Sequence, residues 1–283
     1  MASFTNFATL SYNGGTTNSN IVTGEILEAL TAVKTAVSAN YSAGDRITYA
    51  LSLVNTGTAA VTDYTVTDDL GGYTVGANTV YPLAYNAGTV RYYINGVLQN
   101  APTVTAGPPL TVTGLTVPAG GSAVLIYETT ATPVAPLSTG SSITNTATIT
   151  GGGLTNPITA QATVETANSA DLTISKALSP TTVTENGRIT YTFVISNTGN
   201  TEATATGNVV VTDTFAPILR NIAVTYNGTA WTEGTNYTYN AATGVFTTLA
   251  GQITVPAATF TQNTDGTFTV TPGTATLVIT GTV

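Results

Sequence analysis

The sequence carries the same run of segments twice, and this repetition constrains its fold more than any other feature. Arg46–Gly57 reads RITYALSLVNTG and Arg188–Gly199 reads RITYTFVISNTG. The triplet Val-Thr-Asp that ends at Asp68 returns at Asp213. Internal repetition of this kind predicts two copies of one structural unit in the chain.

Both copies have the residue pattern of β-strands. Nearly every segment alternates apolar residues with Thr or Ser, and Asn-Gly, Asn-Thr-Gly or Pro-Ala-Gly turns separate the segments. Alternation with a period of two is typical of half-buried antiparallel strands. We therefore predict an all-β chain of two tandem immunoglobulin-like β-sandwiches. Residues 24–33 have some helical character, but the matching segment 164–175 has none, so we expect a strand there as well.

One part of the repeat is displaced from the end of the sequence to its beginning. Ser3–Leu10 matches Ser142–Ile149 in the middle of the chain, and no segment at the end of the second copy matches residues 132–164. We predict an N-terminal donor-strand extension over 1–27, a complete sandwich over 28–166, and a sandwich without its last strands over 167–283.

Composition excludes several classes of function. The 283 residues include no Cys, no His and one Met, so disulfides and thiolate or imidazole metal sites are not expected. Six basic and fourteen acidic residues argue against a nucleic-acid partner. No apolar run reaches the ~20 residues of a membrane helix, so we expect no membrane insertion. We also expect no cofactor, no metal and no enzyme activity beyond self-cross-linking.

The two lysines of the chain, Lys34 and Lys176, occupy the same place in the first strand of each copy. Because neighbouring side chains on a strand point to opposite faces, each lysine shares a face with apolar residues. The same parity directs Asp68 and Asp213 toward the core. It also directs Asn145 inward, together with the matching Asn6.

This combination predicts a covalent cross-link. A buried ammonium tends to lose its proton, and a buried carboxyl tends to keep its own. A neutral lysine beside an Asn carboxamide, with a protonated Asp to move the proton, can form an isopeptide bond with loss of ammonia. The candidate sets are Lys34, Asp68 and Asn145 within one chain, and Lys176, Asp213 and Asn6 between subunits. The competing interpretation of each residue alone is a partly exposed lysine, a strand-end Asp or a turn Asn.

Two family resemblances rest on these residues. Segments such as ITYTFVISNTG (189–199), VVTD ending at Asp213, and Asn145 within TNTAT resemble bacterial surface repeats known as domain of unknown function 11. The order Lys, Asp about 35 residues later, then Asn in the last strand resembles isopeptide-forming domains of collagen-adhesin type. These resemblances imply an extracellular or surface-layer structural role and assign the cross-linking roles to the same lysines, aspartates and Asn145.

An incomplete sandwich leaves an unpaired strand edge, which a donated strand can fill. The donor strand is predicted to present Phe4, Asn6, Ala8 and Leu10 to the groove. Donation to another copy gives a head-to-tail homopolymer, whereas donation within the chain closes it on itself. We favour the filament because it repeats the junction between the two copies within one chain. The chain resembles subunits of spore appendages of anaerobic bacteria, so we expect a cell or spore surface location, reached after signal removal or by lysis of the producing cell.

Two other interpretations remain open from the sequence. Aromatic residues gather in the second copy, which is compatible with a surface adhesin or a carbohydrate-binding module. These residues are Trp231, Tyr226, Tyr237 and Tyr239. The chain could also be a fragment of a longer stalk-like array of repeats.

Overall fold

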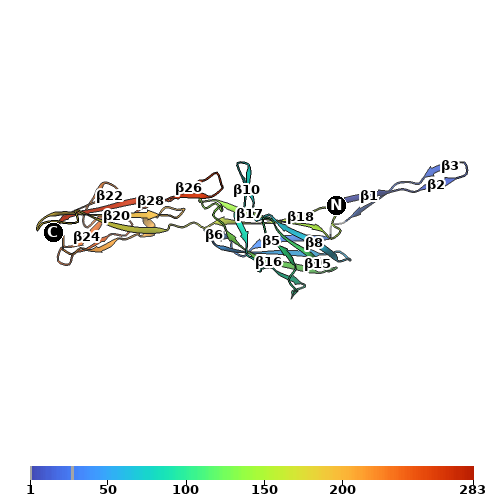
Figure 1. The fold of residues 1–283 in the computed structure, drawn as a ribbon, viewed down its shortest axis with the longest axis horizontal. Coiled ribbons are helices and arrows are strands. Elements are labelled where there is room, and N and C mark those ends of the chain that lie inside the picture. Colours follow the sequence, from blue (N-terminus) through green and yellow to red (C-terminus); the bar gives the residue numbers. More distant parts are fainter. Residues whose placement is uncertain (1, 27–28) are drawn as a thin grey trace. The chain divides into compact units, whose positions relative to one another are not determined.

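The computed structural model describes residues 2–26 and 29–283. The chain divides into two compact units, of which unit 1 comprises Met1–Ala135 with Ser142–Glu165 and unit 2 comprises Pro136–Ser141 with Thr166–Val283. The described residues are almost entirely strands and turns, with one 3-10 turn at Ala205–Gly207 (Figure 1). The all-β prediction is confirmed. The predicted boundary between residues 27 and 28 lies outside the described residues.

The body of unit 1 is a sandwich of two antiparallel sheets. The first sheet has the order β13 (Val97–Leu98), β12 (Arg91–Ile94), β16 (Ser122–Ala131), β7 (Arg46–Asn55) and β5 (Leu30–Ala36), and β11 (Leu83–Tyr85) also pairs with β16. The second has the order β14 (Thr103–Thr105), β15 (Leu110–Val117), β8 (Val61–Asp68), β17 (Ser142–Gly151), β18 (Ile158–Thr166) and β6 (Asn40–Tyr41). A short hairpin joins β9 (Tyr73–Val75) to β10 (Asn78–Val80).

Alternation and turn chemistry account for these strands. Along β16, and from Tyr64 onward in β8, every second residue is buried, as the sequence pattern predicts. Asn95 and Gly96 between β12 and β13 both have positive φ, 49° and 81°, as a two-residue hairpin turn requires. Asn227 and Gly228 repeat this turn in unit 2, with φ of 48° and 80°.

The N-terminal residues form a two-stranded ribbon that belongs to unit 1. β1 (Ala2–Asn6) pairs with β4 (Val22–Ile26), and β2 (Thr9–Tyr12) pairs with β3 (Gly15–Asn18). We call residues 2–26 the N-terminal hairpin. Large apolar side chains along it are exposed, including Phe4, Leu10 and Tyr12. The segment 24–33 contributes residues 24–26 to β4 and residues 30–33 to β5, so its strand character is confirmed there, whereas Leu27 and Glu28 are not described.

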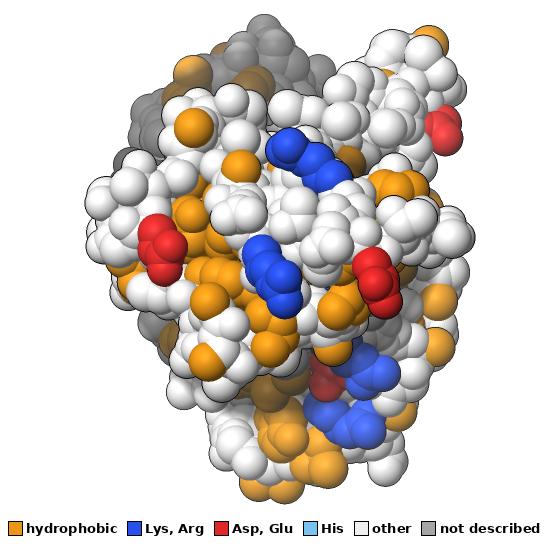
Figure 2. All heavy atoms as spheres, turned by 90° about the vertical axis from the view of Figure 1, so that its left-hand side faces the viewer, with side chains coloured by type: hydrophobic (Ala, Val, Ile, Leu, Met, Phe, Trp, Pro, Cys, Tyr) orange, Lys and Arg blue, Asp and Glu red, His pale blue; other side chains and the backbone are white. Residues whose placement is uncertain are grey.

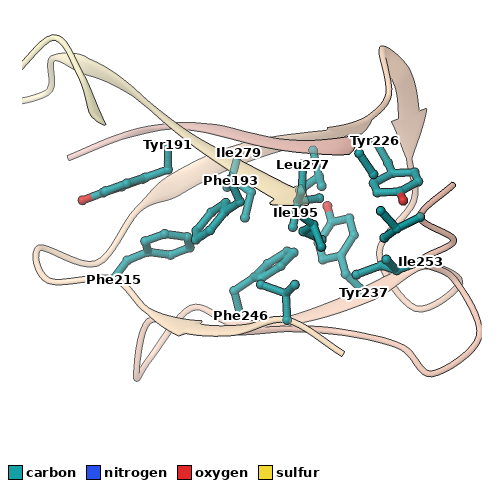
Figure 3. Packing of buried hydrophobic residues seen from close by; sticks show 14 of the residues in the cluster. Tyr191, Phe193, Ile195, Phe215, Tyr226, Tyr237, Phe246, Ile253, Leu277 and Ile279 are labelled. Atoms are coloured by element: carbon teal, nitrogen blue, oxygen red, sulfur yellow. The ribbon is translucent and has the colours of Figure 1, made fainter. Parts of the chain in front are cut away.

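Unit 2 has one large sheet and smaller ones. The large sheet has the order β19 (Leu172–Ser179), β20 (Arg188–Asn197), β28 (Gly273–Thr282), β22 (Arg220–Tyr226) and β23 (Thr229–Trp231). A second sheet has the order β21 (Thr212–Thr214), β25 (Val245–Thr248) and β24 (Tyr237–Asn240), and a hairpin joins β26 (Thr259–Gln262) to β27 (Phe268–Thr271). Tyr191, Phe193, Phe215, Phe246 and Leu277 pack between them (Figure 3).

The strand that carries Asp68 in unit 1 and the strand that carries Asp213 in unit 2 have different numbers of neighbours. In unit 1, β8 is flanked by β15 on one side and β17 on the other. In unit 2, the matching strand β21 is an edge strand and, among the described residues, pairs with β25 alone. The other edge of β21 corresponds to the edge that β17 covers in unit 1.

Candidate functional site

Lys34 lies inside unit 1, on the edge strand β5 of the first sheet. Its side chain is fully buried, and its Nζ donates a 2.6 Å hydrogen bond to Oδ2 of Asp68 on the facing sheet. The ammonium also lies 4.8 Å from the ring centroid of Tyr49 and 5.9 Å from that of Tyr127. The inward direction predicted for Lys34 and Asp68 is what the structure shows.

Asp68 is held in place by several donors. The backbone N–H of Leu70 donates to its Oδ1 at 3.0 Å. The Tyr127 hydroxyl donates to Oδ2, the same oxygen that accepts from Lys34. A carboxylate that accepts this many hydrogen bonds is fixed in position, so the lysine amine has a defined neighbour for proton exchange.

Asn145 completes this cluster from the neighbouring strand. Ala147 on β17 stands opposite Asp68 on β8, and Asn145 lies two residues along the same face. Its side chain is fully buried, and neither atom of its carboxamide forms a hydrogen bond with any residue that the structure describes. Burial raises the pKa of Tyr49 and of Tyr127, and Asn145 lies close enough to both hydroxyls to offset part of this rise. An unpaired buried amide costs about 1–3 kcal/mol, which is unusual for a core position with no chemical role.

The electrostatics of the cluster favour a reactive amine. Burial lowers the pKa of Lys34 from its ordinary value, and Asp68 opposes this shift. Burial raises the pKa of Tyr49 and Tyr127, so both hydroxyls keep their protons and remain donors at neutral pH. Transfer of one proton along the Lys34–Asp68 hydrogen bond yields a neutral amine without changing the net charge of the cluster.

Unit 2 contains the matching pair in a different environment. Lys176 on β19 donates to Oδ2 of Asp213, and its Nζ lies 4.4 Å from the Tyr191 ring centroid. The Lys176 ammonium lies over the core rings of Tyr191 and Phe193, in keeping with its inward direction, but its side chain is 40% exposed. Ile174 and Leu178 on the same strand are exposed as well. The reason is the free edge of β21: among residues 2–26 and 29–283, no strand lies beside Asp213 where β17 lies beside Asp68.

The predicted donor residues Phe4, Asn6, Ala8 and Leu10 are all exposed in the N-terminal hairpin. Asn6 pairs through its backbone with Val22 of β4. The donor is therefore one strand of a preformed hairpin rather than a single extended strand. The structure brings Lys34 together with Asp68, and Lys176 together with Asp213.

Sequence reasoning missed the tyrosines around the site. Tyr127 lies opposite Tyr49 in the first sheet, and the two rings stack with centroids 5.8 Å apart. In unit 2, Tyr191 repeats Tyr49, but Ile279 stands opposite it where unit 1 has Tyr127. The signal was present in the sequence, because the segment 123–127 matches 275–279 and differs at this last position.

Other candidate sites receive less support. The aromatic residues of unit 2 pack on one another: Trp231 stacks on Tyr226 at 4.8 Å, and the Tyr226 hydroxyl donates to the Thr254 carbonyl. Within residues 2–26 and 29–283, no cluster of three or more acidic residues could hold a metal ion. In the same described part of the chain, no helix has the length and hydrophobicity needed to span a membrane.

Comparison with known proteins gives similarities of structure alone. No family model and no curated protein matches the sequence. BcpA, the major pilin subunit of Bacillus cereus, is 14% identical over 96% of this chain and 73% of its own, with a TM-score of 0.36. The 35 kDa C-terminal fragment of the major pilin GBS80 of Streptococcus agalactiae is 15% identical over 87% of each chain, with a TM-score of 0.37.

A third similar structure is ACE19, the collagen-binding subdomain of the Enterococcus faecalis surface protein ACE. It is 10% identical over 49% of this chain and 99% of its own, with a TM-score of 0.31. These three similar structures are two pilins and a collagen-binding adhesin domain. Because the sequence identities and TM-scores are low, these similarities assign no function, and a function can be argued only from the residues of this chain.

Proposed function

We propose that the chain is the structural subunit of an extracellular filament, in which the N-terminal hairpin of one copy completes unit 2 of the next. The contrast between the two lysine sites carries this proposal. Unit 1 has β17 and Asn145 beside its Lys–Asp pair, whereas unit 2 has a Lys–Asp pair beside the free edge of β21. The N-terminal hairpin carries the matching Asn6 on an exposed face.

In unit 1 the cluster supports an intramolecular isopeptide bond. Lys34 passes a proton to Asp68 and attacks Cγ of Asn145 as a neutral amine, so that the Nζ–Cγ bond forms and the Cγ–Nδ2 bond breaks. Asp68 delivers a proton to the leaving nitrogen and takes one from Nζ. Ammonia leaves with the two carboxamide hydrogens and one hydrogen from the lysine. The Tyr127 hydroxyl holds Asp68 in place during both transfers.

In unit 2 the same chemistry needs a second copy. If the hairpin lies along β21 as β17 lies along β8, Ala8 stands opposite Asp213 and Asn6 takes the place of Asn145. The alternation of the donor strand allows one register, because a shift by one residue would turn Phe4 and Leu10 to solvent. The contact joins two different surfaces, so it does not close on itself and generates a filament.

The surface chemistry suits a persistent outer fibre. Charged residues make up 7% of the chain against ~25% in typical soluble domains, and six basic residues leave few sites for trypsin-like proteases. Bonds between subunits would prevent dissociation by dilution. The partners are other copies of the chain, and the proposed location is the cell or spore surface. A pilin-like role is also the one named for BcpA and GBS80.

The proposal is tested by denaturing electrophoresis and intact-mass measurement of the boiled protein beside Asn6→Ala. We expect a heat-resistant ladder that Asn6→Ala abolishes, and a mass lower by one ammonia for each bond. A wild-type protein that runs as a single band and has no oligomers under native conditions contradicts the filament. A monomer without a ladder that is lighter by two ammonia molecules, one of which Asn6→Ala restores, would instead establish an intramolecular bond from Asn6 and hence self-closure.

A further inference from the structure

A hollow of about 660 Å³ opens on unit 2 beside the exposed end of β19. Apolar side chains line much of it, among them Leu178, Val183, Ile189, Tyr191 and Val283. Figure 2 faces the end of unit 2 that carries the C-terminus and shows apolar side chains grouped there, with charged side chains beside them. We call this hollow the β19 pocket.

The repeat shows what fills the equivalent space in unit 1. Ile189 and Tyr191 of the pocket match Ile47 and Tyr49, which are fully buried. Ala216 of the pocket matches Gly71, because each lies three positions after the site aspartate of its unit. A Cβ placed on Gly71 would come within 2.7 Å of Cγ2 of Ile143, so Ile143 packs directly against this position.

The N-terminal hairpin reproduces the pairing of the hairpin that carries Ile143. Residues 3, 4, 5 and 6 pair with residues 25, 24, 23 and 22, and residues 142, 143, 144 and 145 pair with residues 165, 164, 163 and 162. Phe4 therefore occupies the position of Ile143, as Asn6 occupies the position of Asn145. The two hairpins therefore have the same register over four consecutive residue pairs, and the correspondence covers both strands of each hairpin.

Gly24, which pairs with Phe4 across the hairpin, leaves room for the phenylalanine ring. A Cβ on Gly24 would come within 2.4 Å of the Phe4 ring, so the ring lies over this glycine. In unit 1 the corresponding cross-strand pair is Ile143 and Val164. The N-terminal hairpin thus exchanges two medium apolar side chains for one large ring and a glycine. An apolar side chain therefore still projects from the same face of the hairpin.

We propose that the β19 pocket receives the Phe4 ring of a second copy, and that β1 and β4 dock together as a hairpin. This inference rests on the proposed strand donation and adds its anchor residue and its acceptor. In the register that places Ala8 opposite Asp213, Ala8 and the start of β2 lie along the free edge of β21, and β1 continues beyond the end of that strand. β4 reaches the segment 180–187, because in unit 1 the N–H of Glu165 donates to the Ala39 carbonyl at 2.9 Å and residues 25 and 181 are their counterparts.

The test compares two phenylalanines of the same hairpin. Phe4 and Phe7 are 53% and 54% exposed, but Phe7 lies on the opposite face of the donor strand. Both substitutions to alanine are made in the Asn6→Ala background, so that association stays reversible and sedimentation gives its dissociation constant. Loss of a buried Phe corresponds to at least about a hundredfold weaker association. We expect this for Phe4→Ala and less than about threefold for Phe7→Ala.

A second variant tests the acceptor without altering the hairpin. Ala216→Trp fills the β19 pocket and is expected to prevent its chain from accepting a donor while leaving its own hairpin competent. Mixing Ala216→Trp with Phe4→Ala should then give dimers and nothing longer, although neither variant assembles alone. Equal assembly of Phe4→Ala and Phe7→Ala, or normal filaments from Ala216→Trp, would overturn the pocket assignment and leave strand donation intact. No association of the Asn6→Ala parent, together with no wild-type ladder, would instead reject strand donation itself.

Discussion

Replacing Asn145 by alanine is expected to change the stability of unit 1 in a direction that depends on whether the Lys34–Asn145 bond forms. The bond would close a loop of about 110 residues, and a cross-link of that span stabilises a fold by about 4.7 kcal/mol in the chain-entropy model. In the cross-linked protein the Asn145 carboxamide has become part of the isopeptide amide, so the variant regains nothing from its unpaired state. We therefore expect Asn145→Ala to lower the free energy of unfolding of unit 1 by about 4–5 kcal/mol.

Without the bond the sign reverses. The variant then loses only a carboxamide that has no hydrogen-bond partner, so its stability should be unchanged or higher than that of the wild type. Guanidinium unfolding separates the units, because the single tryptophan, Trp231, reports on unit 2, while buried tyrosines such as Tyr49 and Tyr127 contribute near-ultraviolet circular dichroism from unit 1. Asn6→Ala, at an exposed position, should stay within about 0.5 kcal/mol of wild type. A more stable Asn145→Ala protein, with wild-type mass equal to the unmodified chain, refutes the cross-link.

Two further predictions concern the same cluster. Tyr127→Phe removes a hydrogen-bond donor to Asp68 and should slow ammonia loss in unit 1 by at least about tenfold. Ile279→Tyr supplies the matching hydroxyl in unit 2 and should accelerate ladder formation at Lys176. Intact mass measured over time gives both rates. In the Asn145→Ala protein, the lowered pKa of Lys34 means that the folded state binds fewer protons than the unfolded state between this pKa and 10.5, so stability should rise with pH through that window. Unfolding at a series of pH values measures the slope, and a slope that persists when Lys34 is also changed to Met would assign it to another group.

Local sequence determined the strands and the direction of their side chains. Alternation placed Lys34, Asp68 and Asn145 on inward faces, because the side-chain period of a strand is two residues whatever its partners are. Asn-Gly pairs fixed the tight hairpin turns, because both residues must adopt positive φ. The internal repeat then gave the correspondence between the two units, including the shared lysine positions.

Tertiary structure alone decided which of these inward residues are enclosed. Lys34 and Lys176 have the same local pattern, but only Lys34 is covered, because burial depends on the strand that pairs with the facing sheet and not on the lysine strand itself. The same long-range pairing brought the Tyr127 hydroxyl onto Asp68, left the Asn145 carboxamide without a hydrogen bond, and paired β1 with β4 in the register of β17 and β18. The alternation along a strand determines which side chains point inward. Contacts between residues far apart in the sequence determine which neighbouring strand covers those side chains.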